Sequence, residues 1–499
     1  MHRSGQTNDF VANAGLLKDE GPTFSGSAVT VNGSELRKVN SINLFDALKY
    51  YVPSLIVTQS NLTGSDPNAL PAVTLRGANG FPYNAITANN NSGVLNVSST
   101  GDYLAASVTS TGAPVVLLDG IQVSLQTAID IDLNSVQRVT VLKDATATAS
   151  YGMRGANGVI AIETLKPKEG LTISFTEQLQ LATPDVSSYK SLGAKEKIEL
   201  ENNSGLYNNN NLSAIFQKRY NQAYIDGVNT DWLSIPLQNG VGAKHTLALS
   251  STTEDVVYGL TASYNDMQGS MKGSYRKNLD LGAYFGGHFG SFSFNNQFNY
   301  LGSNSSNSTY GSLNNYAQMN PYWSPYDKFT GKFQKFVEID TINSDGTNRY
   351  VNYVNPAYNA TLSTTDAAKY VRYSNTLNLN WVLGSGFQLN GIAGISKQSD
   401  ELNYFLPPNH TTFSNVTPDN LLSRGYYRYT SNSFMDVQGG ARLQYERKFD
   451  RHELFTNIGQ TVIQNSSESE AIAVSGFAVD RLADISFGSA YATKRPVSA

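Results

Sequence analysis

Much of the chain after residue 167 consists of segments in which apolar and polar residues alternate. Leu171, Ile173 and Phe175 are separated by threonine and serine. The same period of two recurs at 258–264, 279–285, 292–300, 373–381, 387–395 and 437–445. Because successive side chains of a β-strand point to opposite faces, this pattern predicts antiparallel strands with one apolar and one polar face.

The alternation leaves two β architectures open. In a soluble sandwich the apolar face is the core and the polar face is wet, whereas a transmembrane barrel turns its apolar face to lipid. No run of 18 apolar residues occurs in the sequence, so a transmembrane helix is excluded. The sequence contains 29 tyrosines and 22 phenylalanines, and its alternating segments have about the length of 10 residues that is typical of barrel strands. Both features favour the barrel.

Composition argues against several classes of function. A net charge of -4 provides no basic stripe for nucleic acid, and the absence of cysteine excludes disulfides and thiolate metal sites. The five histidines are far apart and include no i, i+4 pair, so no metal site is expected. A nucleophile elbow and a phosphate-binding loop are also missing. We therefore expect no enzymatic activity, no catalytic residue and no cofactor.

The segment 141–164 contains signals for a strand, a short capped helix, a glycine turn and a second strand. A short β-rich run ends at Leu142, Asp144 is placed to cap the Ala-Thr segment that follows, and Gly152 is placed to end it. Gly155, Asn157 and Gly158 then predict a turn into a second strand at 159–162. Upstream, the sequence 114–121 predicts a strand that ends in a turn at Asp119 and Gly120.

The first part of the chain shows further local signals. Residues 1–23 are expected to be an irregular lead-in, followed by a strand that ends near Asn32. Asn43, with Asp46 three residues later, predicts a helix that ends before Pro53. A strand at 72–75 leads into Arg-Gly-Ala-Asn-Gly, a sequence that recurs at 154–158. The Asn- and Ser-rich residues 83–111 predict a surface loop, either a solvated connector or a ligand-contacting apex.

Taken together, the segments 114–121 and 141–164 resemble the plug-domain signature of the SusC/RagA family, the TonB-linked outer-membrane transporters of Bacteroidota. The resemblance implies a β-rich fold with a small α/β plug domain at 24–167 and antiparallel transmembrane barrel strands at 168–499. The plug-signature positions carried over are Arg76, Gly77, Asp119, Gly120, Lys143, Asp144, Tyr151, Gly152, Arg154, Gly155, Asn157 and Gly158. Among them, Lys143, Asp144 and Arg154 are expected either to form a polar network inside the plug or to signal its movement.

Two short sequences in the barrel part resemble the same family. Asn-Thr-Asp-Trp at 229–232 resembles a segment that opens an early hairpin, and 319–327 resembles an Asn-Pro-Tyr extracellular loop. Asn320, Pro321 and Tyr322 are thus expected either to face a ligand or to pack within the loop. Large plugged barrels have about 22 strands, and 168–499 supplies half of that or less, so we expect an N-terminal portion with an incomplete barrel.

The resemblance also implies a function and partners. It predicts plug-gated import of oligosaccharides or peptides across the outer membrane, driven by TonB with ExbB and ExbD, with a SusD-like lipoprotein closing the extracellular mouth. The expected contacts are therefore outer-membrane lipid, TonB, the lipoprotein and a glycan or peptide ligand. We find no TonB box in the first twenty residues. The alternative is a surface adhesin or glycan-binding β protein that does not transport.

Overall fold

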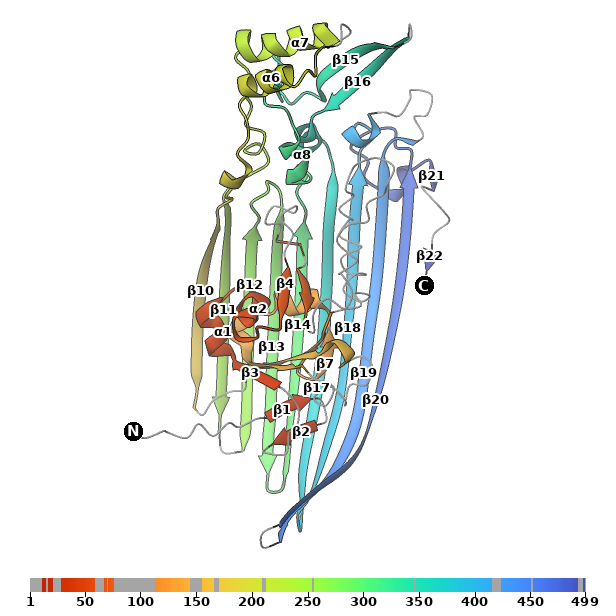
Figure 1. Cartoon of the computed structure of the whole chain (residues 1–499). Helices are drawn as coiled ribbons and strands as arrows, with labels where there is room; N and C mark the ends of the chain where they lie inside the picture. The colour runs from red at the N-terminus through yellow and green to blue at the C-terminus, as the bar shows by residue number, and fades with distance from the viewer. Residues whose placement is uncertain are drawn as a thin grey trace, which may run out of the picture.

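A computed structural model describes residues 11–14, 17–20, 28–58, 67–69, 71–75, 113–143, 155–165, 170–208, 212–253, 255–344, 347–414, 423–449, 452–491 and 497–498. Three parts are evident (Figure 1): a small α/β unit, a tall curved sheet behind it, and a cluster of helices and hairpins at one end of the sheet. We call the described residues of 28–165 the plug. The wall is the set of strands β10–β14 and β17–β20. The crown is formed by the described residues of 183–239 and 307–364.

The plug is built on a five-stranded sheet with the order β3-β8-β9-β6-β7, in which β6 and β9 are parallel and the other neighbours antiparallel. Its strands are β3 (Ala28–Asn32), β6 (Val115–Leu118), β7 (Ile121–Val123), β8 (Val136–Leu142) and β9 (Val159–Thr164). A separate pair joins β4 (Ile56–Thr58) to β5 (Ala72–Thr74). The helical elements are α1 (Gly33–Val39), α2 (Leu44–Tyr51), α4 (Leu125–Asp130) and the 3-10 turn η2 (Leu133–Ser135).

Local sequence signals account for several plug elements. The Asn43 side chain accepts hydrogen bonds from the backbone N–H groups of Phe45 and Asp46, which confirms the predicted helix start. Asp119 and Gly120 both have positive φ, 49° and 88°, and connect β6 to β7 as the predicted Asp-Gly hairpin turn. Gly158 also has positive φ, and a Cβ there would overlap the Leu75 side chain. Position 158 therefore requires glycine, both because its φ is positive and because a Cβ would have no room beside Leu75.

Two elements of this region differ from the sequence-based expectation. The lead-in expected to be irregular contains β1 (Val11–Ala14) and β2 (Leu17–Glu20), which pair antiparallel. Four-residue strands are too short to give a clear period of two, so the pattern does not reveal them. The strand ending at Asn32 runs directly into α1, a helix that we did not predict. The loop at 83–111 lies outside the described residues.

The plug has its own apolar core. Leu36, Phe45 and Leu48 of the two helices are buried against the sheet residues Val139 and Ile160. Replacing Leu48 with alanine is expected to destabilise the plug by about 2–5 kcal/mol, because a completely buried leucine leaves a cavity. Urea unfolding followed by hydrogen exchange in β8 measures the loss. Tyr50→Ala is the control, since Tyr50 on the same helix is 72% exposed and its loss should change stability by less than about 0.5 kcal/mol.

The wall belongs to an 11-stranded antiparallel sheet with the order β10-β11-β12-β13-β14-β17-β18-β19-β20-β21, and β22 pairs with β20. The first strands are β10 (Thr172–Ala182), β11 (Gly240–Thr252), β12 (Val256–Gln268), β13 (Tyr275–Phe289) and β14 (Phe292–Ser306). The others are β17 (Thr365–Gly384), β18 (Phe387–Leu406), β19 (Tyr426–Phe449), β20 (His452–Ser475), β21 (Ala490–Tyr491) and β22 (Val497–Ser498). Among the described residues β10 and β20 are not paired with each other, so the sheet is open.

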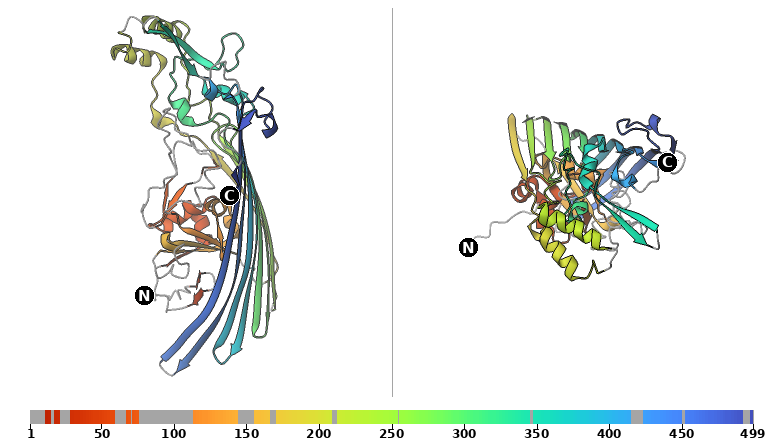
Figure 2. Two further views of the ribbon diagram at one scale, coloured as in Figure 1. Left: turned by 90° about the vertical axis from the view of Figure 1, so that its right-hand side faces the viewer. Right: turned by 90° about the horizontal axis from the view of Figure 1, so that it is seen from above.

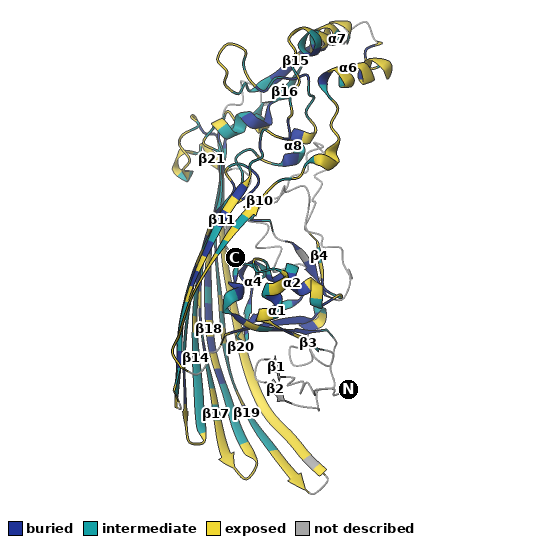
Figure 3. Ribbon diagram, turned by 90° about the vertical axis from the view of Figure 1, so that its left-hand side faces the viewer, coloured by how far each residue is buried: buried dark blue, intermediate teal, exposed yellow. Residues whose placement is uncertain are grey.

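The two faces of the wall have reversed polarity compared with a soluble sandwich. In one row of neighbouring residues, Leu247, Leu281 and Tyr373 are exposed on the face away from the plug. The adjacent row contains Thr246, Ser263 and Arg372, which are buried on the face toward the plug. Figure 2 shows the plug on the concave side of the curved sheet, and Figure 3 shows exposed residues along the strands. Polar residues thus line the inside, as in a barrel.

The crown is formed by two connections between wall strands. The first carries η4 (Ser187–Tyr189), α6 (Ala194–Asn203), α7 (Ser213–Tyr220) and the π-helical turn η6 (Asn221–Ile225). The second carries α8 (Leu313–Ala317), the hairpin of β15 (Phe336–Ser344) and β16 (Thr347–Val354), and η7 (Pro356–Thr361). Two further 3-10 turns, η8 (Thr411–Phe413) and η10 (Ile485–Phe487), lie in later connections. Both crown segments contribute to one apolar core that includes Ile198, Trp232, Tyr316 and Trp323.

Among the described residues, no helix has the length and apolar character needed to cross a membrane.

Candidate functional site

The plug is attached to the wall by buried charge pairs at the end of α4. The Asp130 carboxylate accepts hydrogen bonds from Arg276 Nε at 2.7 Å and Arg276 Nη2 at 2.5 Å. Asn278 Nδ2 donates to the same carboxylate at 2.9 Å, and the Tyr370 hydroxyl also donates to it. Arg276 and Asn278 belong to β13 and Tyr370 to β17, so one plug carboxylate is held by two wall strands.

A second pair lies two residues further along the plug. Asp132 Oδ1 is 2.5 Å from Lys244 Nζ, and Thr246 Oγ1 donates to Asp132 Oδ2 at 2.7 Å. Burial alone would raise the pKa of Asp132, but Lys244 and the hydrogen bonds outweigh burial and lower it. Asp132 is thus held as a carboxylate, and the segment 130–132 connects the plug to β11, β13 and β17.

The Asp-Gly turn forms a third contact with the wall. Asp119 accepts hydrogen bonds from Thr164 N at 2.9 Å and from the Thr164 hydroxyl, and Asn299 Nδ2 of β14 donates to it at 3.4 Å. Gln438 Nε2 of β19 donates to the Gly120 carbonyl at 3.2 Å. The hairpin turn that the sequence predicts therefore also connects the plug sheet to the wall strands β14 and β19.

Asp119 is expected to make plug stability depend on pH. Burial raises its pKa from 3.8 to about 6, although the bonds from Thr164 lower it. The folded protein therefore holds this proton more tightly than the unfolded chain. The contribution of Asp119 to stability is thus greatest below pH 4 and falls as pH rises through 6, by about 3 kcal/mol. Urea unfolding monitored by exchange in β9, at pH 4 and pH 7, tests this. Asp119→Asn should remove the contribution of Asp119 to the difference in stability between pH 4 and pH 7. If the variant shows the same difference as the unaltered protein, Asp119 does not cause this pH dependence.

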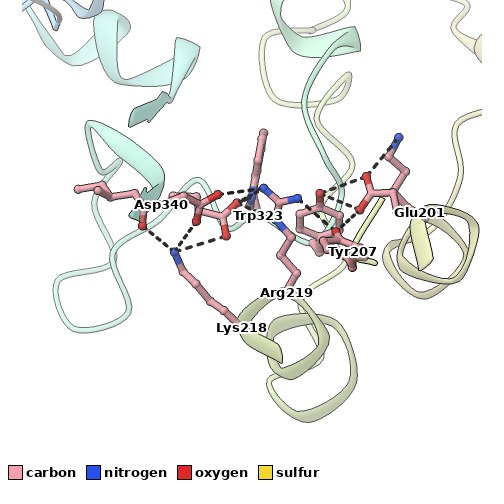
Figure 4. Close-up of polar contacts among 10 residues, drawn as sticks. Glu201, Tyr207, Lys218, Arg219, Trp323 and Asp340 are labelled. Carbon is pink, nitrogen blue, oxygen red and sulfur yellow. Dashed lines mark hydrogen bonds and ion pairs between the residues drawn. The ribbon is translucent and has the colours of Figure 1, made fainter. Parts of the chain in front are cut away.

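A second polar network lies inside the crown (Figure 4). Arg219 of α7 donates from Nε to Glu338 Oε2 at 3.0 Å and from Nη2 to Asp340 Oδ2 at 3.2 Å, both on β15. Its Nη1 donates to the Tyr207 hydroxyl at 3.2 Å, and Tyr207 donates to Glu201 Oε2 at 2.5 Å. The network therefore joins the first crown segment to the second across more than a hundred residues of sequence.

Aromatic rings surround the Arg219 guanidinium. Its Cζ lies 5.4 Å from the Tyr322 ring centroid, 5.8 Å from that of Tyr353 and 5.9 Å from that of Trp323, distances at which a cation is attracted to a ring face. Burial and the Glu201 hydrogen bond raise the pKa of Tyr207 to about 12. Tyr207 is thus a neutral phenol that donates a hydrogen bond to Glu201 and adds no negative charge to the network.

The structure brings some of the predicted site residues together and separates others. Tyr322 is 0% exposed, and its hydroxyl donates a hydrogen bond to Glu201. Its side chain is therefore buried within the crown and does not face a ligand. Asn320 and Pro321 are half-buried, and their carbonyls accept hydrogen bonds from Trp232 Nε1 and Thr230 N. The two short sequences singled out in this region therefore pack against each other, which favours the packing interpretation.

Half of the plug-signature residues lie within the part of the chain that the structure describes. Asp119, Gly120, Gly155, Asn157 and Gly158 form the two turns described above, and Lys143 is half-buried at the end of β8. The remaining six, Arg76, Gly77, Asp144, Tyr151, Gly152 and Arg154, lie outside the described residues. The polar network expected for Lys143, Asp144 and Arg154 therefore stays a prediction. No group of acidic and histidine side chains suited to hold a metal ion occurs in the described ranges.

Sequence comparison identifies the plug region independently. The TonB-dependent Receptor Plug Domain family matches residues 23–159. TonB-dependent receptor P26 of Formosa agariphila is 25% identical over 291 residues, which cover 55% of this chain and 25% of that protein. TonB-dependent receptor SusC of Bacteroides thetaiotaomicron is 24% identical over 185 residues, 34% of this chain and 16% of SusC. The chain is thus similar to TonB-dependent receptors of the SusC/RagA type, and its residues 23–159 match their plug domain.

Solved structures agree with this receptor fold. The RagAB peptide importer in its closed-closed state matches 96% of this chain and 52% of its own chain, with a TM-score of 0.70 and 19% identity. The ferric citrate transporter FecA matches 90% of this chain and 49% of its own, with a TM-score of 0.53 and 12% identity. At these identities the likeness concerns the fold. The chain spans about half the length of these structures and a smaller share of the curated relatives.

Proposed function

We propose that this chain forms the plug and part of the wall of an outer-membrane importer for nutrients such as oligosaccharides or peptides. The observation that supports this most strongly is the reversed polarity of the wall combined with a folded domain held against its polar face. An exposed apolar face suits lipid, and a polar interior suits a hydrated passage that a plug closes. The solved RagAB structure, described as a peptide importer, makes peptides a specific candidate cargo.

Energy coupling and the lid are parts of the same proposal. Charge pairs at Asp130 and Asp132 are buried, so moving the plug requires work that thermal motion rarely supplies. A TonB protein acting through the inner-membrane proton gradient, with ExbB and ExbD, is the proposed source of that work. A SusD-like lipoprotein is the proposed partner at the crown. A surface adhesin or glycan-binding protein that does not transport is the alternative.

An uptake experiment with a cross-linked plug tests the proposal. Thr127 of α4 donates to Gln398 of β18 at 3.3 Å across the plug–wall boundary. The given sequence contains no cysteine, so Thr127→Cys and Gln398→Cys introduce one cysteine pair into this part of the protein for a short bis-maleimide. Cells should take up labelled peptides or oligosaccharides, and cross-linking the double variant should stop uptake, as should dissipating the proton gradient. Each single variant treated with the reagent is the control.

Other outcomes would contradict import. Uptake that continues with the plug cross-linked to the wall would show that the plug does not gate the passage. If deleting the gene abolishes binding of glycans to the cell surface but leaves uptake unchanged, the adhesin alternative is favoured.

A further inference from the structure

A cavity of about 330 Å³ lies between the plug and the wall. On the plug side it is lined by residues at the ends of β6, β9 and η2, and on the wall side by β10–β14 and β17. The wall positions are mostly small, including Thr246, Ala248, Thr261 and Gly282. Small inward side chains leave a hollow that the plug does not fill, so the sequence itself produces the cavity.

One buried guanidinium lining this cavity lacks a full set of partners. Arg372 of β17 is 3% exposed, and its Nη2 has no hydrogen-bond partner among the residues that the structure describes. Within the wall sheet, Arg372 pairs with Leu301, which pairs with Asp280. An apolar side chain therefore separates Arg372 from that carboxylate. A buried cationic donor without an acceptor is costly unless a mobile anion or water completes it.

The nearby carboxylates are engaged elsewhere. Asp119 and Asp436 act on Arg372 electrostatically, but Asp119 accepts its hydrogen bonds from Thr164 and Asn299. No ion pair joins Arg372 to an acidic side chain within the described part of the chain. Arg372 is therefore attracted by negative charge in its surroundings without being neutralised by direct contact.

The charge balance of the cavity favours an anion. Its other guanidinium, Arg37 of α1, donates to the backbone carbonyls of Leu133 at 2.7 Å and Val136 at 3.4 Å, which carry no charge to neutralise it. Among the lining residues, Asp280 carries the carboxylate and Arg37 and Arg372 the two guanidiniums, so the lining itself has one positive charge in excess, with Asp119 and Asp436 outside it. The Nε2 of Gln297 already donates to Asn299 Oδ1 and the Nδ2 of Asn299 to Asp119, so each NH₂ group has one further N–H for a ligand in the cavity.

We infer that this cavity binds a small organic anion through its carboxylate group, with Arg372 as the main contact. A guanidinium is a planar fork of donors that matches the two oxygens of a carboxylate, whereas a chloride ion engages it at a single point. The volume holds a small carboxylate together with several waters, each of which occupies about 30 Å³ in liquid water. This binding site goes beyond the proposed import function and does not require the plug to move.

Trifluoroacetate is a suitable probe for the purified protein in neutral detergent. Its ¹⁹F resonance should broaden on binding, and acetate should reverse the broadening, whereas chloride at the same concentration should not. Arg372→Gln should weaken binding about tenfold or more, because charged hydrogen bonds are lost. Arg372→Lys retains the positive charge but not the planar fork of donors. Its affinity for trifluoroacetate should lie between those of the unaltered protein and of Arg372→Gln. Arg447→Gln is the matched control, since Arg447 on β19 is exposed and far along the strand from the cavity.

Two results would overturn the inference. Equal broadening by the unaltered protein and by folded Arg372→Gln protein would show that the anion binds elsewhere or not at all. Displacement by chloride as effective as displacement by acetate would show an unselective ion site. Because the competition series uses the unaltered protein, the test does not depend on whether any variant folds, and its outcome is separate from that of the uptake experiment.

Discussion

Replacing Asp130 with alanine is expected to loosen the plug from the wall and to cost about 3–5 kcal/mol, because Arg276 would remain buried without its carboxylate. The substitution also leaves Asn278 and Tyr370 without the acceptor they share. Hydrogen exchange of α4 and η2 in the purified protein measures the loss as a decrease in protection.

Asp46→Ala is the matched control for this variant. Asp46 pairs with Lys49 at 2.8 Å near the surface of α2, where an ion pair contributes less than about 1 kcal/mol. Removing a carboxylate there should leave the exchange of α4 unchanged. Equal loss of protection in the two variants would mean that the plug is weakened generally and that Asp130 has no special role in its attachment.

Replacing Arg219 with methionine is expected to destabilise the crown by about 3–5 kcal/mol. Methionine retains most of the apolar stem but leaves Glu338 and Asp340 buried with Lys218 as their remaining cation. The attraction between the guanidinium and its surrounding rings is also lost. Exchange of α7 and β15 should increase together, since the network links the two elements.

Lys218→Met supplies the comparison on the neighbouring residue. The Lys218 side chain is 40% exposed and lies 3.4 Å from both carboxylates, so solvent and Arg219 compensate for much of its loss. We expect a change of less than about 1 kcal/mol. If Lys218→Met and Arg219→Met have the same effect, burial of the guanidinium does not determine crown stability.

Local signals in the sequence predicted the elements that depend on neighbouring residues. Alternation of apolar and polar residues locates seven of the nine wall strands, all except β11 and β20. Asn43 locates the start of α2, and Asp119-Gly120 locates the β6–β7 turn. These features are fixed by backbone geometry within a few residues. Helix α6, rich in lysine and glutamate, had a propensity signal that we did not use.

The attachments between plug, wall and crown could not be predicted in the same way. Asp130 and Arg276 are separated by 146 positions and Arg219 and Glu338 by 119, and neither pair has a local pattern around it. Sequence periodicity also does not say which face of a strand is inside, since a sandwich and a barrel alternate alike. The burial of Thr246 and Ser263 beside exposed Leu247 resolves that ambiguity.

The direct test of this account is to determine what the outer face of the wall contacts. Single cysteines at 260–264 of β12, in a chain with no native cysteine, can each carry a nitroxide in outer-membrane vesicles. We expect high accessibility to oxygen and low accessibility to a nickel complex at 260, 262 and 264, because these side chains should face lipid, and low oxygen accessibility at 261 and 263. Uniform values along the strand, or high nickel accessibility at 260 and 264, would contradict a lipid-facing wall.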